Sequence, residues 1–188
     1  MTNKLIVFSA PSGAGKTTLV KYIIETFNDI EFSISATSRI ARGEEKDGID
    51  YYFLSNKEFK EKVENEEFVE YEEVYGGNYY GTLKSELNRI WRANKIAIFD
   101  IDVVGGANIK NMYPDETLSI FVMPPSINVL KNRLLERGDV SLEEIHVRVK
   151  KAESELDFAT KFDNIIINND LEESKKIAHT LIKEFINE

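Results

Sequence analysis

Continuous apolar runs that alternate with helical sequence constrain the fold of this chain more than any other feature. Four such runs have the length of a strand and lack the polar alternation of a half-exposed strand, and each precedes sequence with helical character. The runs span residues 4–9, 95–101, 117–123 and 163–168, and the helical segments span 15–27, 103–112, 126–136 and 170–187. Strands buried on both faces and joined by helices are typical of parallel sheets. The pattern predicts a three-layer α/β/α core with a parallel central sheet.

Two segments depart from this alternation and predict smaller added parts. Residues 33–83 combine short aromatic-rich strands (51–54 and 68–75), one helix (57–66) and a glycine-rich turn, GGNYYG. We expect them to form an inserted lobe of mixed α and β structure. Residues 126–160 are almost wholly helical and predict a mobile lid. The core then comprises about residues 1–32, 84–125 and 161–188.

Composition excludes several classes of function. The net charge of −9 over 188 residues argues against general nucleic-acid binding, which needs a basic face. No apolar run approaches the ~18–20 residues that span a bilayer, and the amino-terminal run is too short for a signal peptide. Two histidines and no cysteine argue against a zinc site. We therefore expect a cytoplasmic protein that does not act on nucleic acid or membrane.

The sharpest motif follows the first apolar run and reads A-P-S-G-A-G-K-T. It has the Walker A spacing, with alanine in place of the first glycine, and lies between a predicted strand and a predicted helix. Gly13 and Gly15 allow backbone N–H groups to turn inward around an anion. Lys16 can reach the β- and γ-phosphates of a nucleotide, and Thr17 can ligate Mg²⁺. A plain glycine turn with an exposed lysine is the alternative. The predicted ATP-binding residues here are Ala10, Pro11, Ser12, Gly13, Ala14, Gly15, Lys16, Thr17 and Thr18.

The inserted lobe carries residue types suited to a nucleoside monophosphate. Arginine forks and tyrosine hydroxyls bind phosphate oxygens, and a carboxylate accepts from the adjacent N–H donors of guanine. A carboxylate would leave its charge unpaired against adenine, which presents an acceptor at the corresponding position. The candidates for the phosphate are Arg39, Arg42, Tyr51 and Tyr80, and those for the base are Glu70, Ser35 and Thr82. Glu72 or Glu73 could occupy the position that we assign to Glu70.

Two further groups of charged residues fit phosphoryl transfer. Asp100 and Asp102 follow a buried run, so they should lie at the carboxyl end of a parallel strand, where α/β sheets bind ligands. Spaced two apart, they would point the same way, toward Mg²⁺ or guanine; alternatively, Asp102 caps the next helix. Arg133, Arg137 and Arg148 lie in the lid and could close over the transferred group. Salt bridges along the helix surface are the alternative for these arginines.

Nearly the whole chain, about residues 3 to 187, resembles the guanylate kinase family. The shared motifs, in the family's order, are S-x-S-x-x-x-R-x-x-R from residue 33, G-x-D-Y-x-F from 48, F-V-E-Y from 68, G-N-Y-Y-G-T from 77, and the lid patterns R-L-x-x-R-G and R-x-x-x-A-x-x-E-L. One extra residue lies between Glu70 and Asn78 relative to shorter family members. Glu72 and Glu73 therefore remain alternatives to Glu70 as the guanine-binding carboxylate.

The resemblance implies transfer of the γ-phosphoryl group of ATP to GMP, with Mg²⁺ and without a covalent enzyme intermediate. On the family's pattern, Ser35, Glu70, Thr82 and one aspartate of the pair Asp100 and Asp102 contact guanine or its ribose side. Arg39, Arg42, Tyr51 and Tyr80 hold the GMP phosphate. Lys16, Arg42, Arg133, Arg137 and Arg148 neutralise the charge that develops during transfer. Thr17 and Asp100 hold Mg²⁺, partly through water, and Asn168 lies near the adenine of ATP.

Two rival functions follow from the same residues. Catalytically silent guanylate-kinase-like modules bind phosphorylated peptides, but they usually lack the phosphate-loop lysine, which this chain keeps as Lys16. A kinase for another nucleoside monophosphate is the second rival, and the predicted guanine-binding carboxylate argues against it. We expect ATP and GMP as the partners of a monomer or homodimer.

Overall fold

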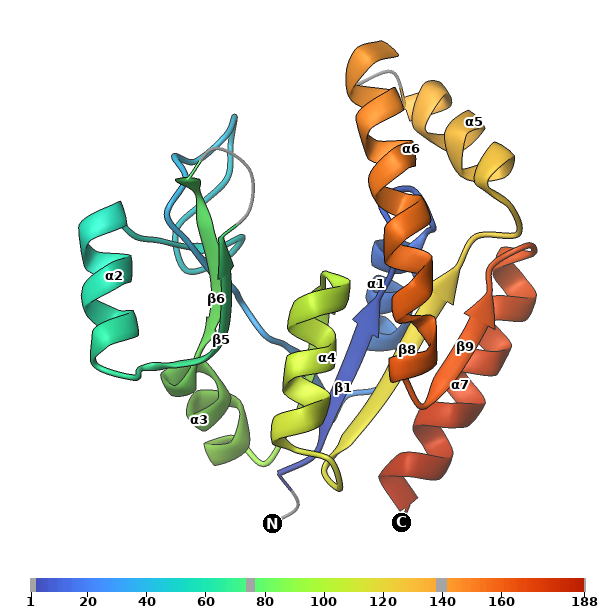
Figure 1. Cartoon of the computed structure of the whole chain (residues 1–188). Helices are drawn as coiled ribbons and strands as arrows, with labels where there is room; N and C mark the ends of the chain where they lie inside the picture. Colours follow the sequence, from blue (N-terminus) through green and yellow to red (C-terminus); the bar gives the residue numbers. More distant parts are fainter. Residues whose placement is uncertain (1–2, 74–76, 138–141, 188) are drawn as a thin grey trace.

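A five-stranded parallel sheet forms the centre of the protein (Figure 1). The computed structural model describes residues 3–73, 77–137 and 142–187, and only the backbone of Arg137 and Leu142. In spatial order the strands are β2 (Ile30–Phe32), β7 (Ile96–Ile101), β1 (Leu5–Ser9), β8 (Thr117–Met123) and β9 (Asn164–Ile167). All neighbouring pairs run parallel. The carboxyl ends of the strands therefore meet at one edge, which is where α/β sheets bind ligands.

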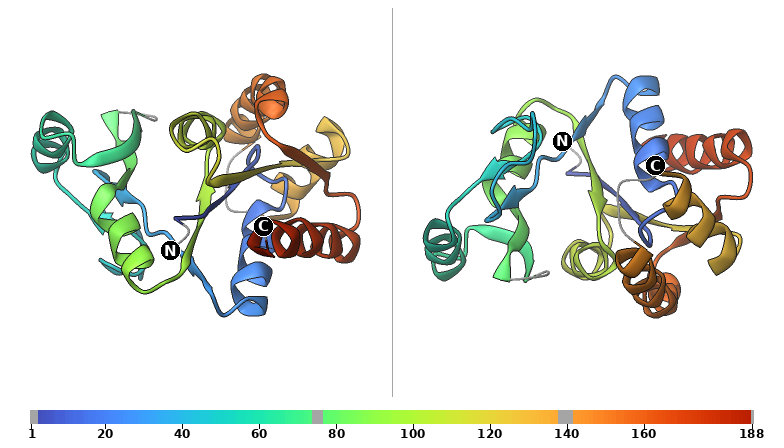
Figure 2. Two further views of the ribbon diagram at one scale, coloured as in Figure 1. Left: turned by 90° about the horizontal axis from the view of Figure 1, so that it is seen from below. Right: turned by 90° about the horizontal axis from the view of Figure 1, so that it is seen from above.

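Helices cover both faces of this sheet, because successive strand side chains point to opposite faces. Ile6 and Phe8 of β1 pack with α1 (Lys16–Thr26) and α7 (Leu171–Asn187). Leu5 and Val7 of the same strand pack with α3 (Lys84–Arg92) and α4 (Val103–Met112). Figure 2 shows α1 and α7 on one face of the strands and α4 on the other. The predicted α/β/α architecture is confirmed.

A second, four-stranded sheet forms a separate lobe beside α4 (Figure 1). Its strands, in spatial order, are β4 (Tyr52–Phe53), β3 (Ala36–Thr37), β6 (Tyr79–Leu83) and β5 (Phe68–Glu73), and α2 (Asn56–Glu64) packs on it. Phe59 of α2 stacks on Phe68 with ring centroids 4.3 Å apart, in a small apolar core of its own. The lobe thus has a core distinct from the two that flank the central sheet.

Two helices, α5 (Ile127–Arg137) and α6 (Leu142–Leu156), form an outer hairpin that continues into a 3-10 helix at Asp157–Lys161. Leu130 and Leu134 of α5 pack on Ile145 and Ala152 of α6, in a buried cluster of their own. The connection between these helices, residues 138–141, lies outside the described residues. None of the helices in the described part of the chain has the length and hydropathy required to cross a bilayer.

The four predicted core strands are β1, β7, β8 and β9, but the edge strand β2 and the helix α3 were not predicted from the sequence. The prediction of a turn at GGNYYG was wrong in its second half, because Tyr79–Leu83 is strand β6. Gly81 is needed there for close packing rather than for turning: a Cβ atom at this position would lie 2.6 Å from the Glu70 carbonyl oxygen.

Candidate active site

The glycine loop between β1 and α1 forms an anion cradle. Gly13 and Gly15 adopt φ angles of 91° and 95°, which residues with a side chain rarely adopt. At Gly15 a Cβ atom would also lie 2.3 Å from Asn168 Nδ2. Helix α1 begins directly after this loop, at Lys16. Its first N–H groups and the positive end of its dipole therefore face any anion held by the loop.

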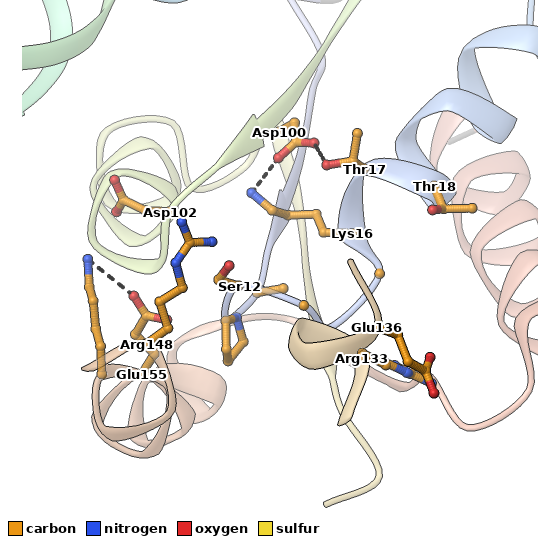
Figure 3. Close-up of a pocket in the computed structure, with 15 residues that line it drawn as sticks. Ser12, Lys16, Thr17, Thr18, Asp100, Asp102, Arg133, Glu136, Arg148 and Glu155 are labelled. Atoms are coloured by element: carbon orange, nitrogen blue, oxygen red, sulfur yellow. Dashed lines mark hydrogen bonds and ion pairs between the residues drawn. The ribbon is translucent and has the colours of Figure 1, made fainter. Parts of the chain in front are cut away.

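A cleft of about 880 Å³ opens over this loop (Figure 3). This volume lies within the range typical of sites for nucleotide-sized ligands. Besides residues of the loop itself, the cleft is lined by charged side chains from β7 and its carboxyl end, α5 and α6: Asp100, Asp102, Arg133, Glu136, Arg148, Lys151 and Glu155. The mixture of cations and carboxylates suits a ligand that carries both phosphate and a metal ion.

Lys16, Thr17 and Asp100 form the centre of the cleft. Thr17 Oγ1 donates a hydrogen bond of 2.6 Å to Asp100 Oδ2, and the Lys16 ammonium forms an ion pair with the same carboxylate. Lys16 Nζ also donates to the Ile101 carbonyl at 2.7 Å. A hydroxyl and a carboxylate side by side are hard oxygen ligands, which Mg²⁺ prefers. Of the predicted pair of aspartates, Asp100 is therefore the one beside the candidate metal-binding hydroxyl.

Asp102 does not share the strand position that the sequence predicts. Strand β7 ends at Ile101, and Asp102 is the N-cap of α4. Its Oδ1 accepts hydrogen bonds from Val104 N at 2.8 Å and Gly105 N at 2.9 Å. The expectation that both aspartates point the same way from one strand was wrong, because the free N–H groups of a helix start bind a carboxylate. Asp102 nevertheless lines the cleft.

The lid arginines differ in what they contact. Arg133 lines the cleft and donates to the backbone carbonyls of Asn168 at 2.9 Å and Ala14 at 3.4 Å. Asn168, which is buried, donates from Nδ2 to the same Ala14 carbonyl at 2.7 Å. Helix α5 and the connection between β9 and α7 are thus both bound to the phosphate loop. Arg148 also lines the cleft, from α6, whereas the side chain of Arg137 lies outside the described residues.

Three of the four predicted monophosphate ligands lie together in the lobe. Arg39, only 8% exposed, donates from Nε to the Tyr80 hydroxyl at 3.0 Å. Its guanidinium carbon lies 4.8 Å from the centroid of the Tyr51 ring. The Tyr51 and Tyr80 rings meet edge to face at 6.0 Å. Burial raises the pKa of the Tyr51 hydroxyl, so this group is a neutral donor. Arg42 is exposed on the adjoining loop.

Glu45 was not predicted, and it is the principal partner of Arg39. Its Oε2 and Oε1 accept from Arg39 Nη1 at 2.6 Å and Nη2 at 2.8 Å, and Oε2 also accepts from Arg42 N at 2.8 Å. The Arg39 guanidinium lowers the pKa of this carboxyl to about 2, helped by the Arg42 amide. No periodicity reveals a pairing six residues apart in an irregular loop.

Lys151 and Glu155 of α6 line the cleft and were also not predicted. They follow Arg148 by three and seven residues, a helical spacing that the sequence does contain.

The predicted base-binding residues Glu70 and Thr82 are opposite each other on β5 and β6. Both are buried, and among the described residues neither Glu70 Oε1 nor Thr82 Oγ1 has a hydrogen-bond partner. Burial, together with the negative charges of Asp102 and Glu72, raises the pKa of Glu70 to about 7, against the lowering effect of the nearby Thr82. Unsatisfied buried polar atoms of this kind are typical of a ligand site. Ser35 is half-buried, and its carbonyl accepts from Tyr52 N at 2.9 Å.

The alternatives to Glu70 have different surroundings. Glu72 is half-buried, and burial together with Asp102 raises its pKa to about 7. Glu73 is exposed and accepts a hydrogen bond of 3.1 Å from the Tyr79 hydroxyl. Only Glu70 combines deep burial with an unsatisfied oxygen opposite Thr82. This contrast favours Glu70 as the base-binding residue.

A phosphate loop at the carboxyl edge of a parallel sheet, together with a second lobe that brings together most of the predicted phosphate and base ligands, is the arrangement of a P-loop nucleotide kinase. The family model for guanylate kinase matches residues 2–185. The chain therefore belongs to the guanylate kinase family, as its sequence motifs predicted.

Similar proteins agree with this assignment. The guanylate kinase of Bacteroides thetaiotaomicron is 51% identical over 187 residues, which cover 100% of this chain and 92% of the relative. The guanylate kinase of Porphyromonas gingivalis is 50% identical and covers 97% of this chain and 98% of its own length. The crystal structure of guanylate kinase from Anaplasma phagocytophilum superposes with a TM-score of 0.73 at 30% identity, over 96% of this chain and 85% of that chain.

Proposed function

We propose that the protein transfers the γ-phosphoryl group of ATP to GMP, giving ADP and GDP, in the cleft over the phosphate loop. Family membership supports the reaction, and one observation carries the choice of acceptor. This observation is the buried Glu70, whose unsatisfied carboxylate oxygen lies opposite Thr82. Guanine presents adjacent N–H donors to such an acceptor, whereas adenine would leave the carboxylate unpaired.

In this proposal the phosphate loop holds ATP. Backbone N–H groups of the glycine loop and of the first turn of α1 surround the phosphates, and Lys16 exchanges its contact with Asp100 for the β- and γ-phosphate oxygens. Asn168, beside the loop, contributes to the adenine side. Thr17 and Asp100 would hold Mg²⁺, which would shield the negative charge of the phosphates.

The lobe binds and orients GMP. Arg39, Arg42, Tyr51 and Tyr80 bind the phosphate of GMP, and Glu70, Ser35 and Thr82, with Asp102 or Asp100 nearby, bind the base or its ribose side. The GMP phosphate is already a nucleophile near neutral pH, so no side chain needs to act as a strong base. Its oxygen attacks the γ-phosphorus in line, the bond to the ADP oxygen breaks, and no covalent enzyme intermediate forms. Catalysis then consists of positioning and charge stabilisation.

Charge on the transferred group is neutralised from both sides of the cleft. Lys16 and Arg42 act with Arg133, Arg137 and Arg148 of the lid, of which Arg133 and Arg148 line the cleft. We propose that the chain divides into functional parts as the sequence predicts. These parts are a core at about 1–32, 84–125 and 161–188, a GMP-binding lobe at 33–83 and a lid at 126–160. Closure of the lid over the phosphates excludes water and so suppresses hydrolysis of ATP. We further expect a cytoplasmic monomer or homodimer that acts without nucleic acid or membrane.

A coupled assay of ADP release tests the acceptor. With ATP and Mg²⁺, we expect turnover with GMP to exceed that with AMP, UMP or CMP by at least a hundredfold, because only guanine matches the Glu70 carboxylate. Equal rates with all four acceptors would overturn the guanine assignment and leave a kinase. A folded protein that turns over none of them would instead be a silent binding module.

Glu45 gives a second testable expectation. Replacing it with glutamine turns one accepting oxygen into an NH₂ group that faces the donors of Arg39, so the arginine loses its fixed orientation. We expect KM for GMP to rise roughly tenfold, the size of one charge-assisted hydrogen bond, while KM for ATP stays the same. Glu44→Gln, which removes the adjacent exposed carboxylate, is the matched control and should behave like wild type. A lower KM in Glu45→Gln would mean that Glu45 competes with the phosphate for Arg39.

A further inference from the structure

A buried carboxylate at the base of the lobe joins the lobe to the core. Glu86 of α3 is 2% exposed and accepts four hydrogen bonds. Its Oε1 accepts from Ile34 N and Arg89 Nη2, both at 2.9 Å. Its Oε2 accepts from the Tyr52 hydroxyl at 2.8 Å and Arg89 Nε at 2.9 Å. Each oxygen thus accepts two hydrogen bonds, and hydrogen bonding of this kind is the condition under which a buried charge is tolerated.

The donors come from different parts of the molecule. Ile34 lies in the connection between β2 of the core sheet and β3 of the lobe, and Tyr52 lies on β4 of the lobe. Helix α3 follows β6 of the lobe but buries Leu87 and Ile90 in the apolar cluster of the core. Glu86 is therefore fixed to the core by its helix. It accepts hydrogen bonds from a strand of the lobe and from one of the two chain connections between the core and the lobe.

Arg89 extends the same network to the edge of the central sheet. Its guanidinium also forms an ion pair with Glu31 of β2, and Lys95 Nζ lies 3.0 Å from the other oxygen of Glu31. Burial alone would raise the pKa of Glu86, but hydrogen bonds from Arg89, Ile34 and Tyr52 outweigh burial and lower it. The carboxylate therefore stays ionised, and the network holds at neutral pH.

We propose that Glu86 is a positioning residue that fixes the orientation of the lobe relative to the phosphate loop. The inference rests on the proposed function, because the group it orients is the GMP site. Glu86 itself lies outside the residues that we propose to bind either substrate. With the lobe held in place, GMP binds a preformed site; without it, GMP must also restrict the motion of the lobe. The effect should therefore fall on GMP binding rather than on the phosphate loop or the chemical step.

Glu86→Gln places an NH₂ group against donors and should release the lobe. We expect KM for GMP to rise about tenfold, with kcat reduced less than threefold and KM for ATP unchanged. Tyr52→Phe removes one of the four hydrogen bonds and should give a smaller change of the same kind; it also serves if Glu86→Gln fails to fold. Glu67→Gln removes a carboxylate that pairs with Lys62 inside the lobe, and this control should leave all constants as in wild type.

A distance measurement separates this inference from the proposed function, since it needs no substrate. The chain has no cysteine, so spin labels can be attached at Glu64→Cys on α2 and Lys176→Cys on α7, both exposed. We expect a broader distribution of the label–label distance when Glu86→Gln is added, and no change with Glu67→Gln. An unchanged distribution, or a KM for GMP within twofold of wild type in a GMP-active enzyme, overturns the inference. A wild type inactive toward GMP overturns the proposed function, and the distances then test the fixing of the lobe alone.

Discussion

Lys16→Ala is expected to lower kcat for GMP phosphorylation by about a thousandfold or more. Lys16 is the cation at the start of α1, beside Asp100 and the glycine loop. During transfer, negative charge spreads over the oxygens of the phosphoryl group, and a fixed cation in a water-poor cleft stabilises this charge far more than it stabilises the ground state. An alanine leaves the loop intact, so KM for ATP should change much less than kcat.

Lys21→Ala is the matched control for this variant. Lys21 lies on the same helix and is exposed, so its removal should leave kcat within twofold of wild type. The Lys16 variant loses an ion pair of partly exposed groups, so a cooperative thermal unfolding transition close to that of wild type should verify its fold. Retention of more than a tenth of wild-type kcat in the folded Lys16 variant would contradict the assigned role of Lys16.

The sequence was sufficient for the features that depend on local pattern. Strands β1, β7, β8 and β9 are continuous apolar runs, and the phosphate loop follows from glycine, lysine and threonine at fixed offsets. The short edge strand β2 escaped prediction because its three residues carry no usable periodicity. The sequence predicted a turn over residues 76–81 because three of them are glycine, but Tyr79, Tyr80 and Gly81 belong to strand β6. In the structure, Gly81 is instead required by the close approach of the neighbouring strand.

The parts of the site that could not be predicted depend on contacts between distant segments. Whether Asp102 extends β7 or caps α4 is decided by where the strand ends, and the residue types allow both. Glu45 and Glu86 are ordinary acidic residues in the sequence, and their partners become evident only when the loop and α3 are folded. Sequence patterns identified the groups proposed to touch substrate, and the structure added those that hold them in place.

Glu70→Gln is expected to lower kcat/KM for GMP by about a hundredfold, with KM for ATP unchanged. Glutamine offers guanine one acceptor and one mismatched donor in place of two acceptors, and it loses a charge-assisted hydrogen bond. The pH dependence should change as well. Because the pKa of Glu70 is about 7, its carboxyl takes up a proton as the pH falls below 7, and kcat/KM for GMP should fall with it. In Glu70→Gln this component of the pH dependence should be lost, while the titration of the GMP phosphate, near pH 6, should remain.

The same substitution should stabilise the protein, because the folded-state pKa of Glu70, about 7, lies above its ordinary value of 4.5. Between these pH values the folded protein binds more protons than the unfolded chain, so ionisation lowers the free energy of unfolding as the pH rises from about 4.5 to 7. In Glu70→Gln this pH-dependent loss of stability is absent. Above pH 7 the variant should be more stable than wild type by up to roughly 3 kcal/mol, and below pH 4.5 the two proteins should not differ. Urea unfolding of both proteins at several pH values measures the difference. A buried carboxylate kept for binding guanine lowers stability until guanine arrives, so lower activity with higher stability is the result that this role requires. A variant that loses both would show that Glu70 supports the fold of the lobe instead.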